Sequence, residues 1–173
     1  GHRVFYGNVD PENVAEIVSS HIAGGTPVTA MALGYLAQEG SDAPLPAGIP
    51  DLDQHPMRVW ENRIALRNAG NIDPMDIYQY VANGGYRALH KALTNMTREE
   101  TLEEVKASGL RGRGGAAFPT AVKWNFLAGN PAIEKYVLCN CEEGDPGAFN
   151  DKNILESVPH TLLEGVIIAG YAT

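Results

Sequence analysis

The sequence predicts an α/β protein, and two observations carry that prediction. Residues 135–141 form an apolar run with the length and composition of a buried strand. Helical patterns lie on either side of it, one over residues 120–127 and one that begins near residue 159. Helices that flank an apolar strand along the chain are typical of layered α/β architectures, in which helices cover a sheet.

Residues 1–37 have the pattern of the end of a domain. A short strand is predicted over residues 3–9, followed by Asp10 as a helix N-cap with a proline directly after it. Apolar residues then recur at helical spacing until Gly24. One strand and one helix cannot bury two faces alone, so we expect this segment to be the C-terminal remnant of a domain that begins earlier.

Residues 38–56 predict a linker, because prolines dominate them among Gly, Ser and Asp. Such a composition is typical of an extended connection without a core of its own. A second domain is expected over residues 57–173. Within it, residues 63–67 match a short strand, and Asp73 with the proline after it marks a helix start.

Further helices are predicted between this start and the apolar strand. Residues 86–93 match a short apolar helix, and Thr97 with Glu100 forms a capping box for the next one, which ends at Gly109. The acidic residues of that helix are interpreted as a solvated face. The helical pattern after residue 159 still continues at the end of the sequence, so we expect both ends to be cut from a longer protein.

Charge and hydropathy exclude several classes of protein. The 173 residues carry a net charge of -8, and a pI near 5.0 argues against binding to nucleic acid or to an anionic membrane surface. No apolar run approaches the roughly 20 residues that a membrane span needs, and the N-terminus has no secretory signal pattern. We expect a cytoplasmic protein without direct membrane insertion.

Cys139 and Cys141 are the only cysteines of the chain. On an extended strand their side chains point to opposite faces and cannot readily pair, which favours a reducing compartment. One C-x-C pair without a second pair is weak evidence for zinc or an iron–sulfur cluster, so structural thiols are the simpler interpretation. The histidines show no metal-ligand spacing, and His160 is interpreted as a surface or capping residue. No metal site is predicted.

The glycine-rich run GLRGRGGAAFPTAVKW at residues 109–124 has the chemistry of a phosphate site. Glycines leave backbone N–H groups free to close around an oxyanion, and the helix that begins after Pro119 adds a partial positive charge. Arg111, Arg113 and Lys123 supply full charges. The spacing is neither that of a P-loop nor G-x-G-x-x-G, so neither of those mechanisms applies.

Alternatives stay open for this run. A flexible loop is possible for any cluster of glycines, whereas an RGG-type nucleic-acid segment normally lies in repetitive surroundings that are absent here. Phe118 and Phe126 flank the run, and an exposed ring can stack on a nucleotide base. Taken singly, each phenylalanine favours a place in the core over a ligand platform.

The second motif, NCEEGDPG at residues 140–147, follows the apolar strand directly. Ligands dock at the carboxyl ends of strands in open α/β sheets. Carboxylates at that edge can accept hydrogen bonds from ribityl or ribose hydroxyls and from an amide. A plain acidic turn is the alternative interpretation, and the segment does not match a full calcium loop.

Together, the two motifs closely resemble the flavin-binding core of the NADH-oxidising subunit of respiratory complex I. The resemblance runs from residue 109 to the end of the chain and extends upstream through RIALRNAGNIDPMDIYQYVANGGYRAL. That upstream run is most similar to the soluble members, which belong to bifurcating or NAD(P)-reducing hydrogenases and formate dehydrogenases. The opening VFYGNVDPENVAEIV resembles the last strand and helix of the thioredoxin-like ferredoxin domain that precedes the flavin domain there.

The resemblance implies roles for particular residues. The family's glycine-rich loop cradles FMN, and the matching residues are Gly112, Arg113, Gly114 and Lys123. Its polar residues after the strand hold the flavin and reach the nicotinamide, which implicates Asn140, Glu142, Glu143 and Asp145. Its two aromatic residues stack on the NADH adenine and match Phe118 and Phe126. The chain departs from the family at three positions, with Ala117 in place of glycine, Cys141 in place of alanine and Glu142 in place of aspartate.

The resemblance also implies the fold and the reaction. Residues 57–173 would be the N-terminal half of a Rossmann-like FMN-binding layer, after the thioredoxin-like remnant. The reaction would be an NADH dehydrogenase step, with hydride passing from NADH to FMN and single electrons then passing to iron–sulfur clusters. No catalytic acid or base is required, because the cofactors carry the chemistry. The expected partners are a ferredoxin-like 2Fe-2S subunit and other iron–sulfur subunits.

The same resemblance implies that these residues alone are incomplete. The family's 4Fe-4S cysteines and the second half of its flavin domain have no counterpart here, so the isolated fragment is expected to be inactive. The alternative hypothesis is a non-catalytic docking piece, or an inert fragment that cannot bind flavin alone.

Overall fold

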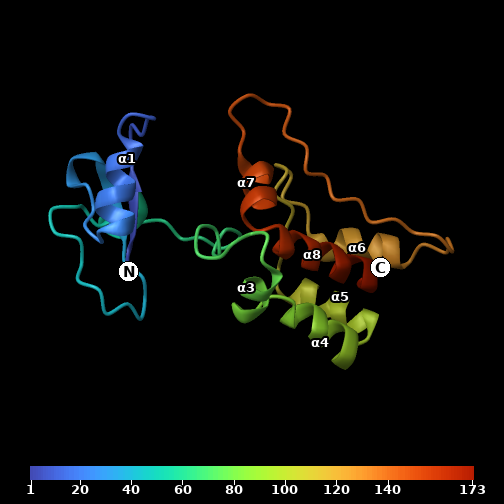
Figure 1. Cartoon of the computed structure of the whole chain (residues 1–173). Helices are drawn as coiled ribbons and strands as arrows, with labels where there is room; N and C mark the ends of the chain where they lie inside the picture. The colour runs from blue at the N-terminus through green and yellow to red at the C-terminus, as the bar shows by residue number, and fades with distance from the viewer. The chain divides into compact units, whose positions relative to one another are not determined.

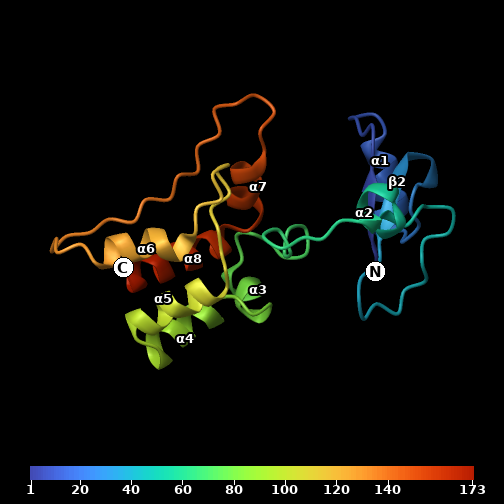
Figure 2. The ribbon, with the colours of Figure 1, turned by 180° about the vertical axis from the view of Figure 1, so that it is seen from behind.

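The computed structural model describes all residues from 1 to 173. The chain forms two compact units, Gly1–Asn62 and Arg63–Thr173, which we call unit 1 and unit 2. Unit 1 combines helix with a small sheet, whereas unit 2 is built from helices (Figure 1, Figure 2). The mixture of helix and sheet agrees with the α/β class, while the domain boundaries inferred from the sequence stay predictions.

The sheet of unit 1 has two antiparallel strands, β1 (Arg3–Tyr6) and β2 (Ala32–Leu36). Val4 lies opposite Tyr35, and the register shifts after Phe5. The strand predicted over residues 3–9 is therefore confirmed for its first part.

A helix follows β1 as predicted, but with an irregular geometry. It begins as α1 (Val14–Glu16) and continues as the π-helix η1 (Ile17–Ala23). The N-cap is Asn13 and not Asp10, so that prediction is wrong. The Asp10 carboxylate instead accepts N–H groups two and three residues later, at 2.9 Å each, and organises the turn before the helix. Gly24 ends the helix, in agreement with the glycine stop signal.

The proline-rich segment expected to be a linker packs in part on β2. The N–H of Tyr35 donates to the carbonyl of Pro50 at 2.9 Å, and Ile49 is buried. A Cβ at Gly34 would lie 2.5 Å from the Leu52 side chain, so only glycine at this position lets Leu52 pack there. Short helical turns complete unit 1, namely η2 (Thr29–Met31), η3 (Leu52–Gln54) and α2 (Pro56–Val59).

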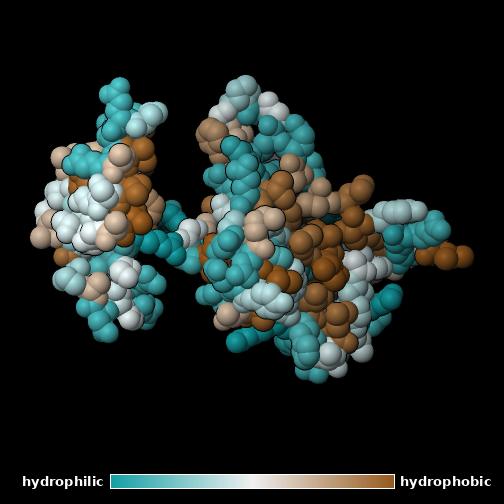
Figure 3. Space-filling view, in the orientation of Figure 1, coloured by the Kyte–Doolittle hydropathy of each residue, from teal (hydrophilic) through white to brown (hydrophobic).

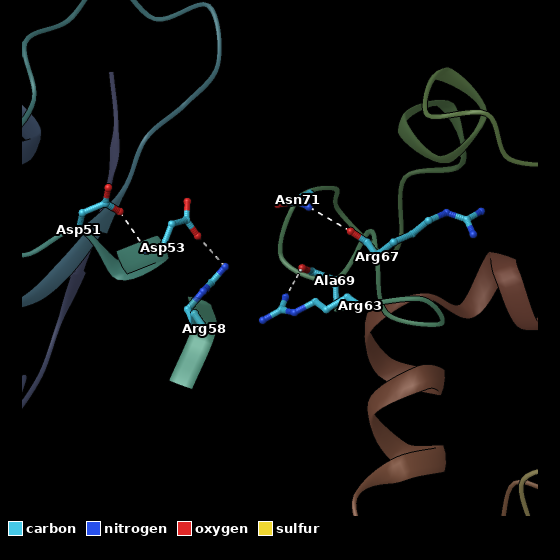
Figure 4. A network of polar contacts seen from close by, with 7 residues as sticks. All are labelled: Asp51, Asp53, Arg58, Arg63, Arg67, Ala69 and Asn71. Atoms are coloured by element: carbon cyan, nitrogen blue, oxygen red, sulfur yellow. Dashed lines mark hydrogen bonds and ion pairs between the residues drawn. The ribbon is translucent and has the colours of Figure 1, made fainter. Parts of the chain in front are cut away.

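An ion pair ties the last two of these turns together. Arg58 and Asp53 lie 2.9 Å apart, and the N–H of Asp53 donates to the Asp51 carboxylate at 2.9 Å (Figure 4). Both carboxylates are exposed enough to be screened by solvent, so the contacts order the turns more than they stabilise the unit.

Unit 2 consists of helices that pack around the C-terminal one. They are α3 (Ile77–Ala82), α4 (Arg87–Asn95), α5 (Arg98–Ala107), α6 (Thr120–Ala128), α7 (Asn150–Ser157) and α8 (Pro159–Ala172). The last of these contacts α4, α5, α6 and α7. The core between them includes Tyr80, Ala92, Leu102, Ala121 and Ala169. The predicted capping box of Thr97 and Glu100 is confirmed, since both of its hydrogen bonds are present.

A buried carboxylate, Glu164 on α8, joins three helices of this core. Its exposed fraction is only 9%, and it accepts the Tyr80 hydroxyl at 2.6 Å. It also accepts the N–H groups of Tyr86 and Leu89, at 2.9 Å and 3.1 Å, at the N-terminus of α4. Tyr86 has a φ of 59°, which is unusual for a bulky residue, and the hydrogen bond to Glu164 holds it there.

His160 completes this cluster and corrects a prediction. Its Nδ1 lies 2.9 Å from the Tyr86 hydroxyl, and its ring stacks on Tyr80 with centroids 5.4 Å apart. The interpretation of His160 as a surface or capping residue is therefore wrong. The partners of His160 lie more than 70 residues away in the sequence, so no local pattern reveals them.

The two strands predicted for unit 2 are not formed. Residues 63–67 lie in turns, where the Arg63 guanidinium donates to the Ala69 carbonyl at 3.3 Å and the Asn71 side chain donates to the Arg67 carbonyl at 3.1 Å (Figure 4). Residues 135–141 lie in a long loop that leaves the helices and returns at α7 (Figure 1). A strand needs a neighbour for its backbone N–H and C=O groups, and unit 2 contains none.

Two helix starts also differ from the predictions. Asp73 organises a turn by accepting the N–H of Met75 at 2.9 Å, and Asp76 is the N-cap of α3. Helix α7 was not predicted at all, because its N-cap residue Phe149 is not of a capping type.

Candidate functional site

The glycine-rich run forms a loop whose two ends are held together. The N–H of Gly112 donates to the carbonyl of Phe118 at 2.8 Å, and the N–H of Thr120 donates to the carbonyl of Leu110 at 3.0 Å. The Arg111 guanidinium adds a bond to the Ala117 carbonyl at 3.1 Å. We call residues 110–120 the glycine loop. Its closure fixes residues 113–116 as a tip directly before α6.

The tip of the glycine loop is surrounded by open space. A Cβ added to Gly114 or Gly115 would meet no protein atom within 4 Å. Gly115 has a φ of 104°, which only glycine adopts without strain, so this glycine is required by the turn. The backbone of the tip is therefore accessible to a ligand.

The N-terminus of α6 is not capped by any side chain. Pro119 occupies the N-cap position, and the first turn contains no acidic residue. Orphan N–H groups at a helix start attract anions, and Arg113 and Lys123 are exposed beside them. An oxyanion at this point would find free donors and full positive charge together.

Phe118 of the glycine loop and Phe126 of α6 are both exposed. Phe118 has an exposed fraction of 47% and Phe126 on α6 one of 69%. Neither ring is part of the core of unit 2. Figure 3 shows a broad apolar surface on unit 2. Other exposed apolar side chains of α6 and α8 include Val122, Leu163 and Ile167.

The NCEEGDPG motif lies within the long loop between α6 and α7. Asn140, Glu142 and Asp145 are exposed, whereas Glu143 is half-buried. A shallow hollow of about 270 Å³ is lined by Glu142, Glu143, Gly144, Asp145 and Ala148. Carboxylates in such a hollow can accept hydrogen bonds from hydroxyl or amide groups of a ligand.

Glu143 differs from the other acidic residues because its oxygens are already bonded. One oxygen accepts the N–H of Asp151 at 2.7 Å, and the other accepts the N–H of Lys152 at 3.2 Å. Burial of the carboxyl acts to raise its pKa, but these N–H donors outweigh burial and hold the pKa of Glu143 below its ordinary value.

The two cysteines belong to the same long loop. Cys139 is exposed, and the Sγ of Cys141 lies 3.7 Å from the Asp151 carbonyl oxygen. Burial, and next the charge of Asp151, raises the pKa of the Cys141 thiol, so the thiol stays protonated and can donate. No group of three or more His, Cys, Asp or Glu side chains is placed to hold a metal ion.

The structure assembles each motif separately. Gly112, Arg113, Gly114 and Lys123 share one end of α6 with Phe118, while the acidic residues share the long loop. No hydrogen bond or ion pair joins one set to the other. Sequence reasoning missed Glu164, whose only signal was a carboxylate inside an apolar helical pattern. No helix of unit 1 or unit 2 is long and apolar enough to cross a membrane.

Comparison with known proteins assigns a family to most of unit 2. Residues 105–173 match the family described as the Nuo51 FMN-binding domain. This match contains the glycine loop and the NCEEGDPG motif in full.

Individual relatives extend the match upstream. The chain is 54% identical over 110 residues to the HndC subunit of the NADP-reducing hydrogenase of Solidesulfovibrio fructosivorans, which covers 64% of this chain and 22% of that protein. It is 49% identical over 109 residues to an NADH-quinone oxidoreductase subunit of Rhizobium meliloti, covering 63% and 26%. An NADH-quinone oxidoreductase subunit of Aquifex aeolicus is 52% identical over 96 residues, covering 56% and 22%.

The match is strong but partial, because it spans about a quarter of the length of these relatives. Residues 105–173 therefore match the Nuo51 FMN-binding domain family, and the chain is similar over that region to subunits of NADH-quinone oxidoreductase and of NADP-reducing hydrogenase.

Proposed function

We propose that this chain supplies the FMN-phosphate and NADH-adenine contacts of an oxidoreductase flavoprotein subunit. The observation that carries the proposal is the uncapped N-terminus of α6 beside the glycine loop. Both lie inside the segment that matches the FMN-binding family. Neither fact alone points to a flavin, whereas an open phosphate cradle within a flavin-binding family does.

The FMN phosphate is assigned to the glycine loop. The backbone of Gly112 and Gly114 would approach the phosphate, and Arg113 and Lys123 would neutralise its charge. The open space at Gly114 and the absence of a competing cap on α6 support this assignment, because a dianion needs both room and unpaired donors.

The flavin and nicotinamide are assigned to the acidic loop. The exposed polar groups of Asn140, Glu142 and Asp145 would accept hydrogen bonds from ribityl hydroxyls and from the nicotinamide amide. Glu142 and Asp145 form no ion pair with a basic side chain, so their oxygens are free to accept. Glu143 has other partners.

The NADH adenine is assigned to Phe118 and Phe126. An exposed aromatic ring contributes roughly 1–3 kcal/mol when a base stacks on it. Phe118 is a residue of the glycine loop and Phe126 lies on α6 directly after it, so the adenine site would be close to the phosphate site but separate from it.

The bound cofactors would supply the redox chemistry, with hydride passing from NADH to FMN and electrons then leaving for iron–sulfur clusters. The residues of this chain would bind and orient the two nucleotides. No acid or base is needed among them.

The remaining parts of the proposal concern the parent protein. A 4Fe-4S cluster, the second half of a Rossmann-like layer and a 2Fe-2S partner subunit would complete it. Residues 1–37 would close a thioredoxin-like domain, and the location would be cytoplasmic. The relatives are named as subunits of NADH-quinone oxidoreductase and of an NADP-reducing hydrogenase, which supports a multi-subunit assembly.

Titration of this chain with FMN tests the proposal directly. We expect quenching of flavin fluorescence with a dissociation constant in the micromolar range, about -8 kcal/mol. Riboflavin, which lacks the phosphate, is the matched control and should bind at least about tenfold more weakly, since one charge-assisted hydrogen bond contributes roughly 1.5–3 kcal/mol. Equal binding of both would contradict the phosphate assignment, and binding of neither would favour a docking or inert fragment.

A further inference from the structure

The residues of the acidic loop alternate in exposure before Gly144. Asn140 and Glu142 are exposed, whereas Cys141 and Glu143 are half-buried. Alternating exposure is the pattern of an extended segment with one face against the protein and the other toward solvent. The four residues are therefore divided between two tasks.

The covered face is bonded to the start of α7. Glu143 accepts the N–H groups of Asp151 and Lys152, which are the second and third residues of that helix. Those are the two donors that an N-cap side chain normally satisfies. The N-cap residue itself, Phe149, provides no side-chain cap, so Glu143 performs the capping from six residues before it.

A second contact supports the same attachment. The Cys141 thiol lies 3.7 Å from the Asp151 carbonyl oxygen, on the same residue whose N–H Glu143 accepts. Two alternate residues of the loop thus hold one residue of α7. The exposed pair, Asn140 and Glu142, projects from a segment whose orientation these contacts fix.

From this geometry we infer that Glu143 is a positioning residue, which clamps the acidic loop to α7 so that Asn140 and Glu142 are presented to the flavin. The inference rests on the proposed function for its cofactor and revises the family-based role of Glu143. Each oxygen of the Glu143 carboxylate already accepts a backbone N–H group of α7, so these two bonds fix its position and direction.

Amide hydrogen exchange in the FMN-free chain tests the clamp itself. In Glu143→Ala the amides of Asp151 and Lys152 should exchange at least about tenfold faster, because they lose their acceptors. Amides of α4 should not change. Glu156→Gln, which removes a charge from the other end of α7, is the matched control and should leave both amides protected. Unchanged exchange in Glu143→Ala would overturn the clamp.

FMN affinity tests what the clamp does for the site. Glu143→Ala should weaken FMN binding about tenfold, and Glu143→Gln should recover part of the loss because its carbonyl oxygen still accepts one N–H. Glu142→Gln should weaken FMN binding without changing the exchange of either α7 amide. Faster exchange in Glu143→Ala with unchanged FMN affinity would show a helix cap without a positioning role.

The two arms separate this inference from the proposed function. If the unmodified chain does not bind FMN, the proposed function and the cofactor part of the inference fail together, while the exchange rates still decide the clamp. If FMN binds and Glu143→Gln weakens it as much as Glu143→Ala without faster exchange, Glu143 is itself a ligand of the flavin and the inference is overturned.

Discussion

The N-termini of α4 and α6 both present backbone N–H donors, but only those of α4 are bonded to a side chain. At α4, Glu164 reaches across from α8 and accepts two N–H groups in the interior of unit 2. At α6, no side chain caps the helix, and the neighbouring charges are those of Arg113 and Lys123. A helix start that the fold needs is filled by the protein, and one that is left open is available to a ligand.

Helix α7 is a third case of how a helix start is bonded. Its N-terminus is capped by Glu143, as α4 is capped by Glu164, but at the surface. The start of α8 also lacks a side-chain cap, so the feature that distinguishes α6 is the pair of exposed basic residues, Arg113 and Lys123, beside its open start. The predictions below test each side of this contrast.

The largest effect is expected from Glu164→Ala. The change leaves the Tyr80 hydroxyl and two N–H groups without their acceptor inside the core, which should lower the free energy of unfolding of unit 2 by about 3–5 kcal/mol. Trp124 reports on unit 2 in a Trp60→Phe background, because the chain has only 2 tryptophans. Glu156→Ala, an exposed control, should cost less than about 0.5 kcal/mol. Equal losses of unfolding free energy in the two variants would contradict a stabilising role of Glu164.

Acid should weaken the same contact. Burial acts to raise the pKa of Glu164, but the Tyr80 hydroxyl and the N–H groups of α4 outweigh it and hold the pKa below its ordinary value. A lowered pKa in the folded state adds stability above the unfolded value of about 4.3 and loses it as pH falls through the folded value. Urea midpoints of the native chain should therefore drop below about pH 4.3 more steeply than those of Glu164→Gln. Parallel curves would contradict this prediction.

The next largest effect is expected at the open helix start. Gly114→Val should weaken FMN binding by about 100-fold or more, since loss of two hydrogen bonds to a charged phosphate is worth roughly 3 kcal/mol or more. The fold should persist, because a Cβ at Gly114 meets no protein atom within 4 Å. Gly165→Val on α8, where the space is equally open, is the control and should bind FMN normally. Full FMN affinity in Gly114→Val would contradict the assignment of the FMN phosphate to the glycine loop.

A smaller effect separates the adenine from the flavin. Phe126→Ala should leave FMN affinity and the unfolding of unit 2 unchanged, since its ring is 69% exposed. NADH affinity should fall by about 10- to 100-fold, the equivalent of roughly 1–3 kcal/mol of stacking. Tyr78→Ala on α3, with a ring that is 83% exposed, should change neither affinity. Loss of FMN together with NADH would place Phe126 at the flavin instead.

Local signals in the sequence account for most helices of unit 2. The capping box at Thr97 and the proline before α6 each mark a helix start that the structure contains. The start of α7 could not be predicted, because its cap is Glu143 rather than a residue at the helix end. The role of Glu164 was hidden for the same reason, since its partners lie 75 to 84 residues away.

The failed strand has the opposite cause. Residues 135–141 are apolar enough for a buried strand, but composition indicates burial and not pairing. Leu138 is 90% exposed and Tyr136 is 73% exposed, so the side chains that predicted a buried strand are uncovered in the long loop. A strand depends on a neighbour elsewhere in the sequence, whereas the glycine loop closes on itself between Leu110 and Thr120.

The smallest effect should come from Ala117→Gly in the glycine loop. Ala117 has a φ of 49°, a left-handed conformation that costs an L-residue roughly 1–2 kcal/mol. Glycine removes that strain but adds about 0.5–1 kcal/mol of unfolded-state entropy, so a net gain of up to about 1 kcal/mol is expected. Ala116→Gly is the matched control, because Ala116 has no positive φ and should lose about 0.5–1 kcal/mol.

The unfolding of both variants can be followed by the fluorescence of Trp124. Changes of opposite sign in the free energy of unfolding would show that closure holds the loop before α6 in a strained shape. The same sign for both would mean that the loop relaxes in solution, and the open start of α6 would then be less preorganised for an anion than the filled start of α4.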